Sequence, residues 1–155
     1  MDRCGKLSCW QGPEFAQAGE QNKRIALEYF DAFVKGDKDW WALHVSPDFR
    51  RHDPGLPYVV IGPAGLQNHH DVLLTGVPDL NLHIHTVIAE GDKVLACLRF
   101  CGTHTGEMFG YQPTGNAIDV EVFDLFQLQD GMLVEHWAMV DSLGMLKALG
   151  ATQLS

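Results

Sequence analysis

Positive charge is scarce in this chain, and so are long apolar runs. Eleven lysines and arginines stand against twenty aspartates and glutamates, which gives a formal net charge of −9 at pH 7. This balance argues against nonspecific binding to nucleic acid or to an anionic membrane surface. The chain has no stretch of about eighteen apolar residues, the length needed to cross a bilayer. Residues 1–15 lack the apolar core of a signal peptide. We therefore expect a cytoplasmic protein with no nucleic-acid partner and no membrane partner.

Cysteine is also rare, and the four cysteines do not suggest a disulfide or a zinc site. Cys97 and Cys101 lie four residues apart on a predicted strand. That spacing is roughly 13 Å at about 3.3 Å per residue, too far for a disulfide. Cys4 and Cys9 have no second Cys/His pair at zinc-ligand spacing elsewhere in the chain. We predict four free thiols and no metal.

The apolar content is sufficient for one domain with a sizeable core. The chain has 155 residues, of which 46% are hydrophobic and 20% charged, as is ordinary for a globular domain. We interpret residues 1–19 as a flexible leader and residues 20–155 as a single domain.

The period of the apolar pattern changes near residue 80. Before that point it repeats about every 3.6 residues and predicts helices over 20–35, 37–44 and 63–76, with Asp37 capping the second. A short strand is expected over 49–52, between a turn at 46–48 and a loop at 53–57. Later the period is two, which predicts strands over 80–89, 94–105, 118–129 and 132–141, before a short helix over 143–149. Helices followed by an antiparallel meander indicate an α+β fold, whose curved sheet would leave an apolar pocket for a small molecule.

The last predicted hairpin carries ionisable groups on otherwise apolar strands. An aspartate or histidine on the buried side of such a strand must be satisfied or used. A three-residue loop over 129–131 would put Asp124 opposite His136 and Val122 opposite Ala138. A two-residue loop at Asp130-Gly131 would instead turn Asp124 toward Trp137, because a slip of one residue reverses the faces of a strand.

Six short segments between about residues 22 and 150 carry a family resemblance. They are His52-Asp53-Pro54 with Gly62-Pro63, Ala89–Val94, Gly102–Glu107, Gly110–Gly115, Asp130-Gly131 with Glu135-His136-Trp137, and Asp141–Leu146. Their order and spacing resemble the SnoaL-like family, which includes polyketide ester cyclases and belongs to the nuclear-transport-factor-two-like superfamily. The resemblance implies a cone-shaped, cystatin-like α+β barrel with a curved antiparallel sheet, a deep apolar cavity, and neither metal nor cofactor. It also implies a homodimer or homotetramer formed through the sheet, and a small apolar or polycyclic carbonyl compound as ligand.

The same resemblance bears on the site. In the true cyclases the reaction is an intramolecular aldol closure of an anthracycline precursor. The acid/base carboxylate lies on the last strand and a helper histidine on the preceding one. Those positions hold Ala138 and Asp124 in this chain. Because both face the cavity in the family, the resemblance favours the three-residue loop, with Asp124 and His136 on one cavity wall.

We predict that Asp124 and His136 form the catalytic pair. Asp124 would orient His136 and raise its basicity, and His136 would move a proton at a carbon next to a carbonyl. The alternative is a buried pair that fixes the register and does no chemistry. The predicted binding residues are two that flank a loop turn, one that caps the last helix or lies at the cavity mouth, and five from cavity walls: His52, Asp53, Asp141, Tyr29, Phe33, Val122, Trp137 and Ala138.

Five other histidines are not assigned to the site. His83 and His85 share one strand face without further metal ligands, so we interpret them as half-buried or interface residues. His69 and His70 are interpreted as surface residues of a helix, and His104 as structural.

Three functions remain open. The first is a cofactor-free enzyme that performs cyclisation, isomerisation or dehydration on an apolar carbonyl compound. The second is a non-catalytic binding protein with the same pocket, which Ala138 favours. The third is hydrolysis, for example of an epoxide by a positioned water, which needs a carboxylate pair and an arginine inside the cone. Arg99 is the only arginine in the sheet-forming half, so hydrolysis ranks third.

Overall fold

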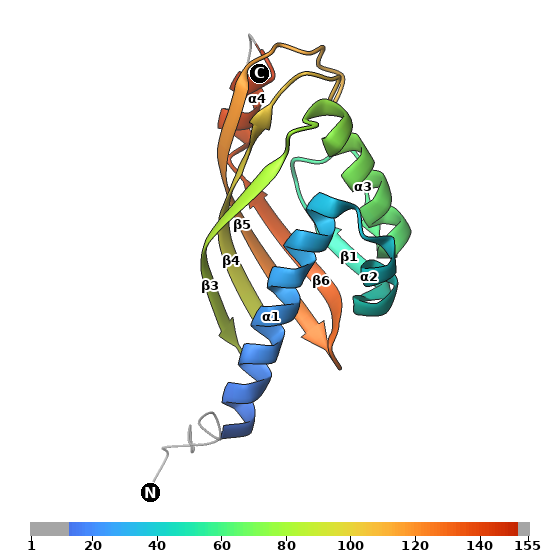
Figure 1. Ribbon diagram of the computed structural model, residues 1–155, viewed down its shortest axis with the longest axis vertical. Coiled ribbons are helices and arrows are strands. Elements are labelled where there is room, and N and C mark those ends of the chain that lie inside the picture. The colour runs from blue at the N-terminus through green and yellow to red at the C-terminus, as the bar shows by residue number, and fades with distance from the viewer. Residues whose placement is uncertain (1–12, 152–155) are drawn as a thin grey trace, which may run out of the picture.

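The computed structural model describes residues 13–151, which form four helices and one curved six-stranded sheet (Figure 1). The elements are α1 (Pro13–Lys35), α2 (Lys38–His44), β1 (Val45–His52), β2 (Val60–Ile61), α3 (Gly62–Gly76), β3 (Asn81–Glu90), β4 (Lys93–Thr103), β5 (Ala117–Gln129), β6 (Met132–Val140) and α4 (Ser142–Ala148). The strand order is β2-β1-β6-β5-β4-β3, and the sheet is not closed. This arrangement confirms the predicted α+β class and cone-shaped fold.

One strand pairing corrects the expectation of an antiparallel sheet. β1 runs parallel to β6, while every other neighbouring pair is antiparallel. β1 is also longer than predicted, because Ser46-Pro47-Asp48 lies inside it rather than in a turn. Its register with β6 shifts between Val45 and Arg50. Such an irregularity accommodates Pro47, which has no N–H to give to a ladder.

The first helix begins earlier than the apolar pattern predicts. Residues 13–19, which we interpreted as part of a leader, belong to α1. Their sequence lacks an apolar stripe, but Pro13 suits the first turn of a helix. Residues 1–12 of the expected leader lie outside the described residues. Asp37 caps α2 as predicted, because its Oδ1 accepts a hydrogen bond of 2.9 Å from the N–H of Trp40. None of the helices in the described range is long and apolar enough to span a membrane.

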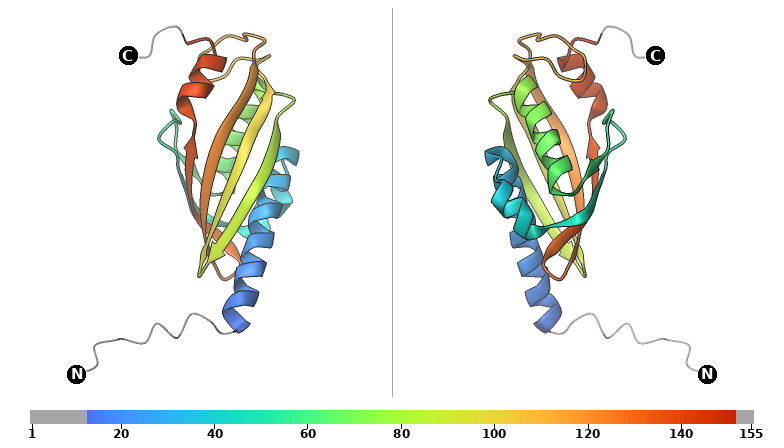
Figure 2. Two further views of the ribbon diagram at one scale, coloured as in Figure 1. Left: turned by 90° about the vertical axis from the view of Figure 1, so that its left-hand side faces the viewer. Right: turned by 90° about the vertical axis from the view of Figure 1, so that its right-hand side faces the viewer.

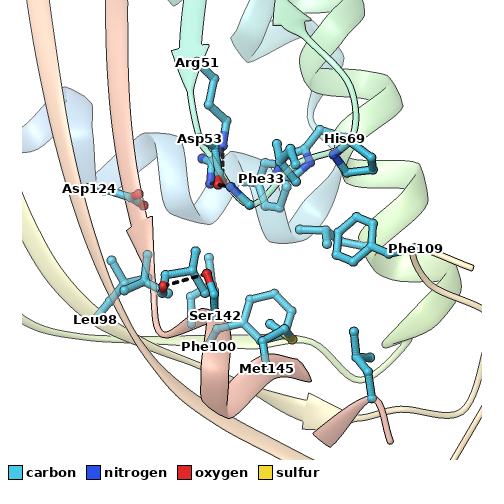
Figure 3. Close-up of a pocket in the computed structure, with 18 of the residues that line it drawn as sticks. Phe33, Arg51, Asp53, His69, Leu98, Phe100, Phe109, Asp124, Ser142 and Met145 are labelled. Atoms are coloured by element: carbon cyan, nitrogen blue, oxygen red, sulfur yellow. Dashed lines mark hydrogen bonds and ion pairs between the residues drawn. The ribbon is translucent and has the colours of Figure 1, made fainter. Parts of the chain in front are cut away.

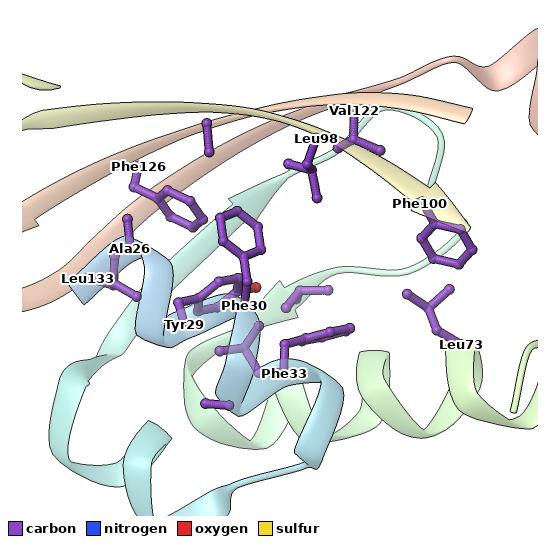
Figure 4. Close-up of a cluster of buried hydrophobic side chains, with 14 of the residues drawn as sticks. Ala26, Tyr29, Phe30, Phe33, Leu73, Leu98, Phe100, Val122, Phe126 and Leu133 are labelled. Atoms are coloured by element: carbon purple, nitrogen blue, oxygen red, sulfur yellow. The ribbon is translucent and has the colours of Figure 1, made fainter. Parts of the chain in front are cut away.

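Helices α1, α2 and α3 all lie on one face of the sheet (Figure 2). The core forms where α1 meets that face (Figure 4). Tyr29 and Phe30 of α1 pack edge-on against Phe126 of β5, with ring centroids 5.0 and 5.6 Å apart. Fully burying a side chain of this size stabilises the fold by about 1.5–3 kcal/mol.

The β5–β6 hairpin turns on two residues, and a β-bulge then resets the register. Asp130 and Gly131 both have positive φ (51° and 77°), and Gln129 pairs with Met132, so the predicted three-residue loop is wrong. With regular pairing after this turn, Asp124 would lie opposite Trp137. Between the pairs Leu128–Leu133 and Gln127–Glu135, however, Val134 is an extra residue. The bulge places Asp124 opposite Ala138 and His136 opposite Phe126. The predicted direct pairing of Asp124 with His136 is therefore wrong, yet both side chains are buried on the inner face.

Candidate active site

A cavity of about 330 Å³ lies between the inner face of the sheet and helices α1, α3 and α4 (Figure 3). Most of its lining is aliphatic or aromatic. The polar or ionisable lining residues are Tyr29, Arg51, Asp53, His69, Tyr111, Asp124 and Ser142. An apolar chamber with a few convergent polar groups is the usual form of a small-molecule site.

Arg51 and Asp53 form a buried ion pair at one side of this cavity. Phe49, Arg51 and Asp53 alternate along β1 and its end, so they share the inward-facing side. Arg51 donates from Nη2 to Asp53 Oδ2 at 2.9 Å and from Nε at 3.3 Å, and the two side chains are only 9% and 5% exposed. The Gly55 N–H donates to the other oxygen, Asp53 Oδ1, at 3.0 Å. Burial opposes the charge of Arg51, but Asp124, Tyr29 and Asp53 outweigh it and raise the pKa of the guanidinium above its ordinary value.

Asp124 and His136 make the second close contact of the site. His136 Nε2 lies 2.9 Å from Asp124 Oδ1, an ion-pair distance. Asp124 Oδ1 has no well-aligned hydrogen-bond donor among the described residues, so the contact is mainly electrostatic. Arg51 Nη1 lies 3.3 Å from His136 Nδ1 and 3.4 Å from His136 Nε2, so the guanidinium is close to both ring nitrogens. Asp124 Oδ1 is therefore a fully enclosed carboxylate oxygen beside the His136 ring, and the charge of Arg51 favours its ionised form.

Burial and neighbouring charges set the ionisation of this pair. Burial raises the pKa of Asp124, but His136 and Arg51 outweigh burial, so the net pKa lies below the ordinary value. Burial lowers the pKa of His136, and Arg51 lowers it further, against the opposing effect of Asp124. We conclude that Asp124 is ionised and His136 is neutral near pH 7.

These burial effects predict that the protein loses stability below pH 7. Burial lowers the pKa of His69 well below 6.5, as it lowers that of His136, so the folded state keeps both rings neutral. The unfolded chain takes up a proton on each ring near pH 6.5. Because the unfolded state then binds more protons, the free energy of unfolding should be lower at pH 5.5 than at pH 7.5, by about 1–1.5 kcal/mol for a ring that stays neutral throughout.

Urea unfolding at the two pH values measures this difference. His69→Phe, which removes one of the two buried imidazoles, should reduce the pH slope. A free energy of unfolding that is constant or rises as the pH falls to 5.5 would contradict neutral His69 and His136.

The structure separates the predicted site residues into two groups. Five of them line the cavity: Asp124, Asp53, Val122, Tyr29 and Phe33. The other five lie outside its lining: His136, Ala138, His52, Trp137 and Asp141. His136 and Ala138 are buried on the inner face behind the lining. Whether any of these ten residues acts in catalysis or binding stays a prediction.

His52, Trp137 and Asp141 lie outside the cavity for identifiable reasons. The rings of His52 and Trp137 stack with centroids 5.3 Å apart, and His52 Nε2 lies 2.5 Å from Glu135 Oε2. His52 follows Arg51 and precedes Asp53, so it points to the outer face that these two avoid. Asp141 accepts a hydrogen bond of 2.9 Å from the Gly144 N–H and caps α4, which agrees with the first of its two predicted roles.

Two residues that sequence reasoning set aside belong to the cavity lining. His69 is only 2% exposed and lines the cavity, so its interpretation as a surface residue is wrong. It shares the buried face of α3 with Leu66 and Leu73, three residues before it and four after it, and that spacing could have identified it. Arg51 was not among the predicted site residues, although its alternation with the buried Phe49 on β1 indicates that it faces inward.

The other polar residues discussed above lie away from the cavity lining. Arg99 pairs with Asp119 and Glu121 at 2.6 Å on the outer face. His83 and His85 are exposed on the same face. His104 is fully buried and contacts Thr114 Oγ1 at 3.0 Å, as a structural residue would. Among the described residues, no group of three or more His, Cys, Asp or Glu side chains is arranged to hold a metal ion.

Comparisons with known proteins identify the family and support the fold. A family model for the SnoaL-like polyketide cyclases matches residues 23–149. A search of curated proteins finds no match to this chain. A crystal structure from Jannaschia sp. CCS1, classed as a SnoaL-like polyketide cyclase, is 29% identical, with 92% of this chain and 98% of that chain covered and a TM-score of 0.78.

Two further solved structures have the same fold. AclR from Streptomyces galilaeus, classed as a hydroxylase, is 27% identical, with 88% of this chain and 89% of that chain covered and a TM-score of 0.73. An LEH-like epoxide hydrolase from M. tuberculosis is 17% identical, with 85% of this chain and 91% of that chain covered and a TM-score of 0.66, and it shares the fold alone. With the family model matching most of its length, the chain belongs to the SnoaL-like polyketide cyclase family.

Proposed function

We propose that this protein is a cofactor-free enzyme that performs acid/base chemistry on an apolar carbonyl compound bound in its cavity. One observation carries the proposal: the buried, ionised Asp124 lines an apolar chamber beside the buried guanidinium of Arg51. A base and a cation next to each other, away from water, suit the formation of an enolate.

The first step is a proton transfer from carbon. Asp124 removes a proton from a carbon next to the carbonyl, the C–H electron pair forms a C=C bond to the carbonyl carbon, and the π pair of the carbonyl moves to its oxygen, where negative charge develops. Arg51 stabilises that oxygen, and the proton later returns from Asp124 to the rearranged product. Cyclisation, isomerisation and dehydration can all proceed from such an enolate. A general base of this kind contributes about 10²- to 10⁴-fold to the rate.

The proposed roles within the pair differ from those predicted from the sequence. His136 does not line the cavity, so Asp124 is the group that contacts the substrate, and His136 is a positioning residue behind it. Because its pKa is lowered, Asp124 is a weak base. The proton that it removes must therefore be acidified by a second activating group as well as by the carbonyl.

Hydrogen exchange tests this function without knowledge of the natural substrate. The probe is 2-tetralone, an apolar bicyclic ketone whose C1 protons are acidified by both the carbonyl and the aromatic ring. In D₂O we expect the protein to accelerate exchange of the C1 protons over buffer, as followed by proton NMR. Exchange at the buffer rate, with 2-tetralone bound, would contradict the proposal and leave the non-catalytic binding function.

A second candidate function is hydrolysis of a strained ether. The Arg51 guanidinium inside the cavity, with Asp53 and Asp124 both close to it, is the arrangement that this reaction requires. Asp124 would take a proton from water as the water oxygen attacks carbon and the C–O bond breaks. The released alkoxide oxygen, stabilised by Arg51, would then take that proton from Asp124 to complete the diol. Indene oxide in H₂¹⁸O distinguishes the two candidates. Accelerated formation of an ¹⁸O-labelled diol favours hydrolysis, and the exchange reaction alone favours enolisation.

Assembly through the sheet and a cytoplasmic location stay predictions, and the first has a specific test. Phe123 and Met139 are exposed cross-strand neighbours on the outer face, and Ile88 is exposed nearby on β3. We propose that a second copy of this chain covers this apolar face. Sedimentation velocity should show a dimer or tetramer that Phe123→Lys converts to a monomer. A monomeric wild-type protein would contradict the proposed assembly through this face.

A further inference from the structure

The cavity has one polar side and one apolar side. Arg51, Asp53 and His69 project into it from β1 and α3, while Leu98, Phe100 and Met145 lie across from them (Figure 3). Arg51 is close enough to His69 for its charge to lower the pKa of that imidazole. A flat ligand would therefore turn one edge toward the polar side and its apolar body toward the sheet and α4.

His69 is the polar group on this side that the proposed mechanism does not use. It is 2% exposed, and its Nδ1 lies 2.9 Å from the hydroxyl of Tyr58. Its Nε2 has no hydrogen-bond partner among the described residues. This atom is also not fully enclosed by its neighbours. The exposed part of the ring therefore includes Nε2, which is open to the cavity.

The contact with Tyr58 determines which ring nitrogen carries the proton. Burial raises the pKa of Tyr58 to about 12, so the phenol keeps its proton near pH 7. The Tyr58 hydroxyl has no other hydrogen bond within the described part of the chain. An imidazole nitrogen is a stronger acceptor than a phenolic oxygen, so Tyr58 donates to Nδ1 of the neutral ring. The second nitrogen, Nε2, then carries the hydrogen and acts as a donor.

We propose that His69 donates from Nε2 to a second oxygen of the ligand, so that the cavity selects flat compounds with two oxygen functions along one edge. One oxygen lies at Arg51 and the other at His69, with Tyr58 fixing the tautomer. This inference rests on the proposed function only in that the ligand occupies this cavity. His69 is a specificity residue and takes no proton in the reaction.

Three matched probes isolate the second oxygen. They are 2,2-dimethylindane-1,3-dione, 2,2-dimethylindan-1-one and 2,2-dimethylindane, which share one body and carry two, one and no carbonyl groups. None has a proton on the carbon next to a carbonyl, so binding is measured without reaction. We expect the wild-type protein to bind the dione about two- to tenfold more tightly than the monoketone, the range of one neutral hydrogen bond.

Variants at two positions assign that preference. His69→Phe keeps a ring but removes the donor, so the dione and monoketone should bind equally, while affinity for the hydrocarbon changes by less than about twofold. His69→Gln keeps an N–H donor and should retain part of the preference. Tyr58→Phe removes the group that fixes the tautomer and should reduce the preference. A dione preference that survives in His69→Phe would overturn the inference.

Nitrogen NMR of the histidine rings gives a second, ligand-free test. We expect His69 in the Nε2–H tautomer in the wild-type protein, and loss of that tautomer's dominance in Tyr58→Phe. A wild-type ring protonated on Nδ1 would overturn the inference. Wild-type protein that binds none of the three probes would contradict the proposed function as well. Binding whose preference for the dione is unchanged in His69→Phe contradicts only this inference.

Discussion

Replacing Arg51 with methionine is expected to lower the free energy of unfolding by about 3–5 kcal/mol. The guanidinium is buried, its Nη2 lies 2.9 Å from Asp53, and its charge favours ionisation of Asp124. Removing it leaves two buried carboxylates without their cation. The free-energy cost of an unpaired buried charge exceeds the stabilisation that the ion pair had contributed. Urea unfolding at pH 7.5 measures the loss.

The matched control is another arginine with two carboxylates. Arg99 contacts Asp119 and Glu121, but on the outer face, where its side chain is 40% exposed. In Arg99→Met, water solvates Asp119 and Glu121, so the free energy of unfolding should fall much less than in Arg51→Met. Without Arg51 the buried carboxyl groups bind protons more readily in the folded state. The cost of Arg51→Met should therefore shrink as the pH falls toward 4. Equal losses for the two variants would contradict the buried ion pair.

Replacing Asp124 with asparagine is expected to reduce the exchange of 2-tetralone C1 protons by about 10²- to 10⁴-fold. The amide has nearly the same shape as the carboxylate but cannot accept a proton from carbon. Affinity for 2-tetralone should stay within about threefold, because the lining of the cavity is otherwise unchanged. Exchange is followed by NMR in D₂O, and affinity by calorimetry.

Asp119→Asn is the control for this variant. Asp119 lies on the same strand, five residues earlier, but its side chain points to the outer face and pairs with Arg99. We expect the wild-type exchange rate in this variant. Wild-type exchange in Asp124→Asn would exclude Asp124 as the base, even if the fold and the binding were intact.

The fold was predictable because its signals are local. The change of apolar period near residue 80 separates helices from strands, and Asp37 marks the start of α2 through its own side chain. The shared face of Asp124 and His136 was also predicted, but from a three-residue loop, whereas the hairpin has a two-residue turn followed by a bulge. Val134, the extra residue of the bulge, reverses the effect of the two-residue turn. No local pattern distinguishes Val134 from an ordinary strand residue.

The composition of the site was harder to predict because it depends on contacts distant in sequence. Arg51 lies 85 residues before His136, and only the parallel pairing of β1 with β6 brings them together. A parallel neighbour leaves no turn signal between its strands, unlike the hairpins that follow residue 80. His69 differs, because its helical spacing from Leu66 and Leu73 was present in the sequence and indicated burial.

A crystal structure of the protein with bound 2-tetralone tests the central claim most directly. We expect the ketone in the cavity, with its oxygen within hydrogen-bond distance of the Arg51 guanidinium and its C1 carbon facing the Asp124 carboxylate. A ketone bound outside the cavity, or inside it with its oxygen against the apolar wall of Leu98 and Phe100, would contradict the proposed acid/base site.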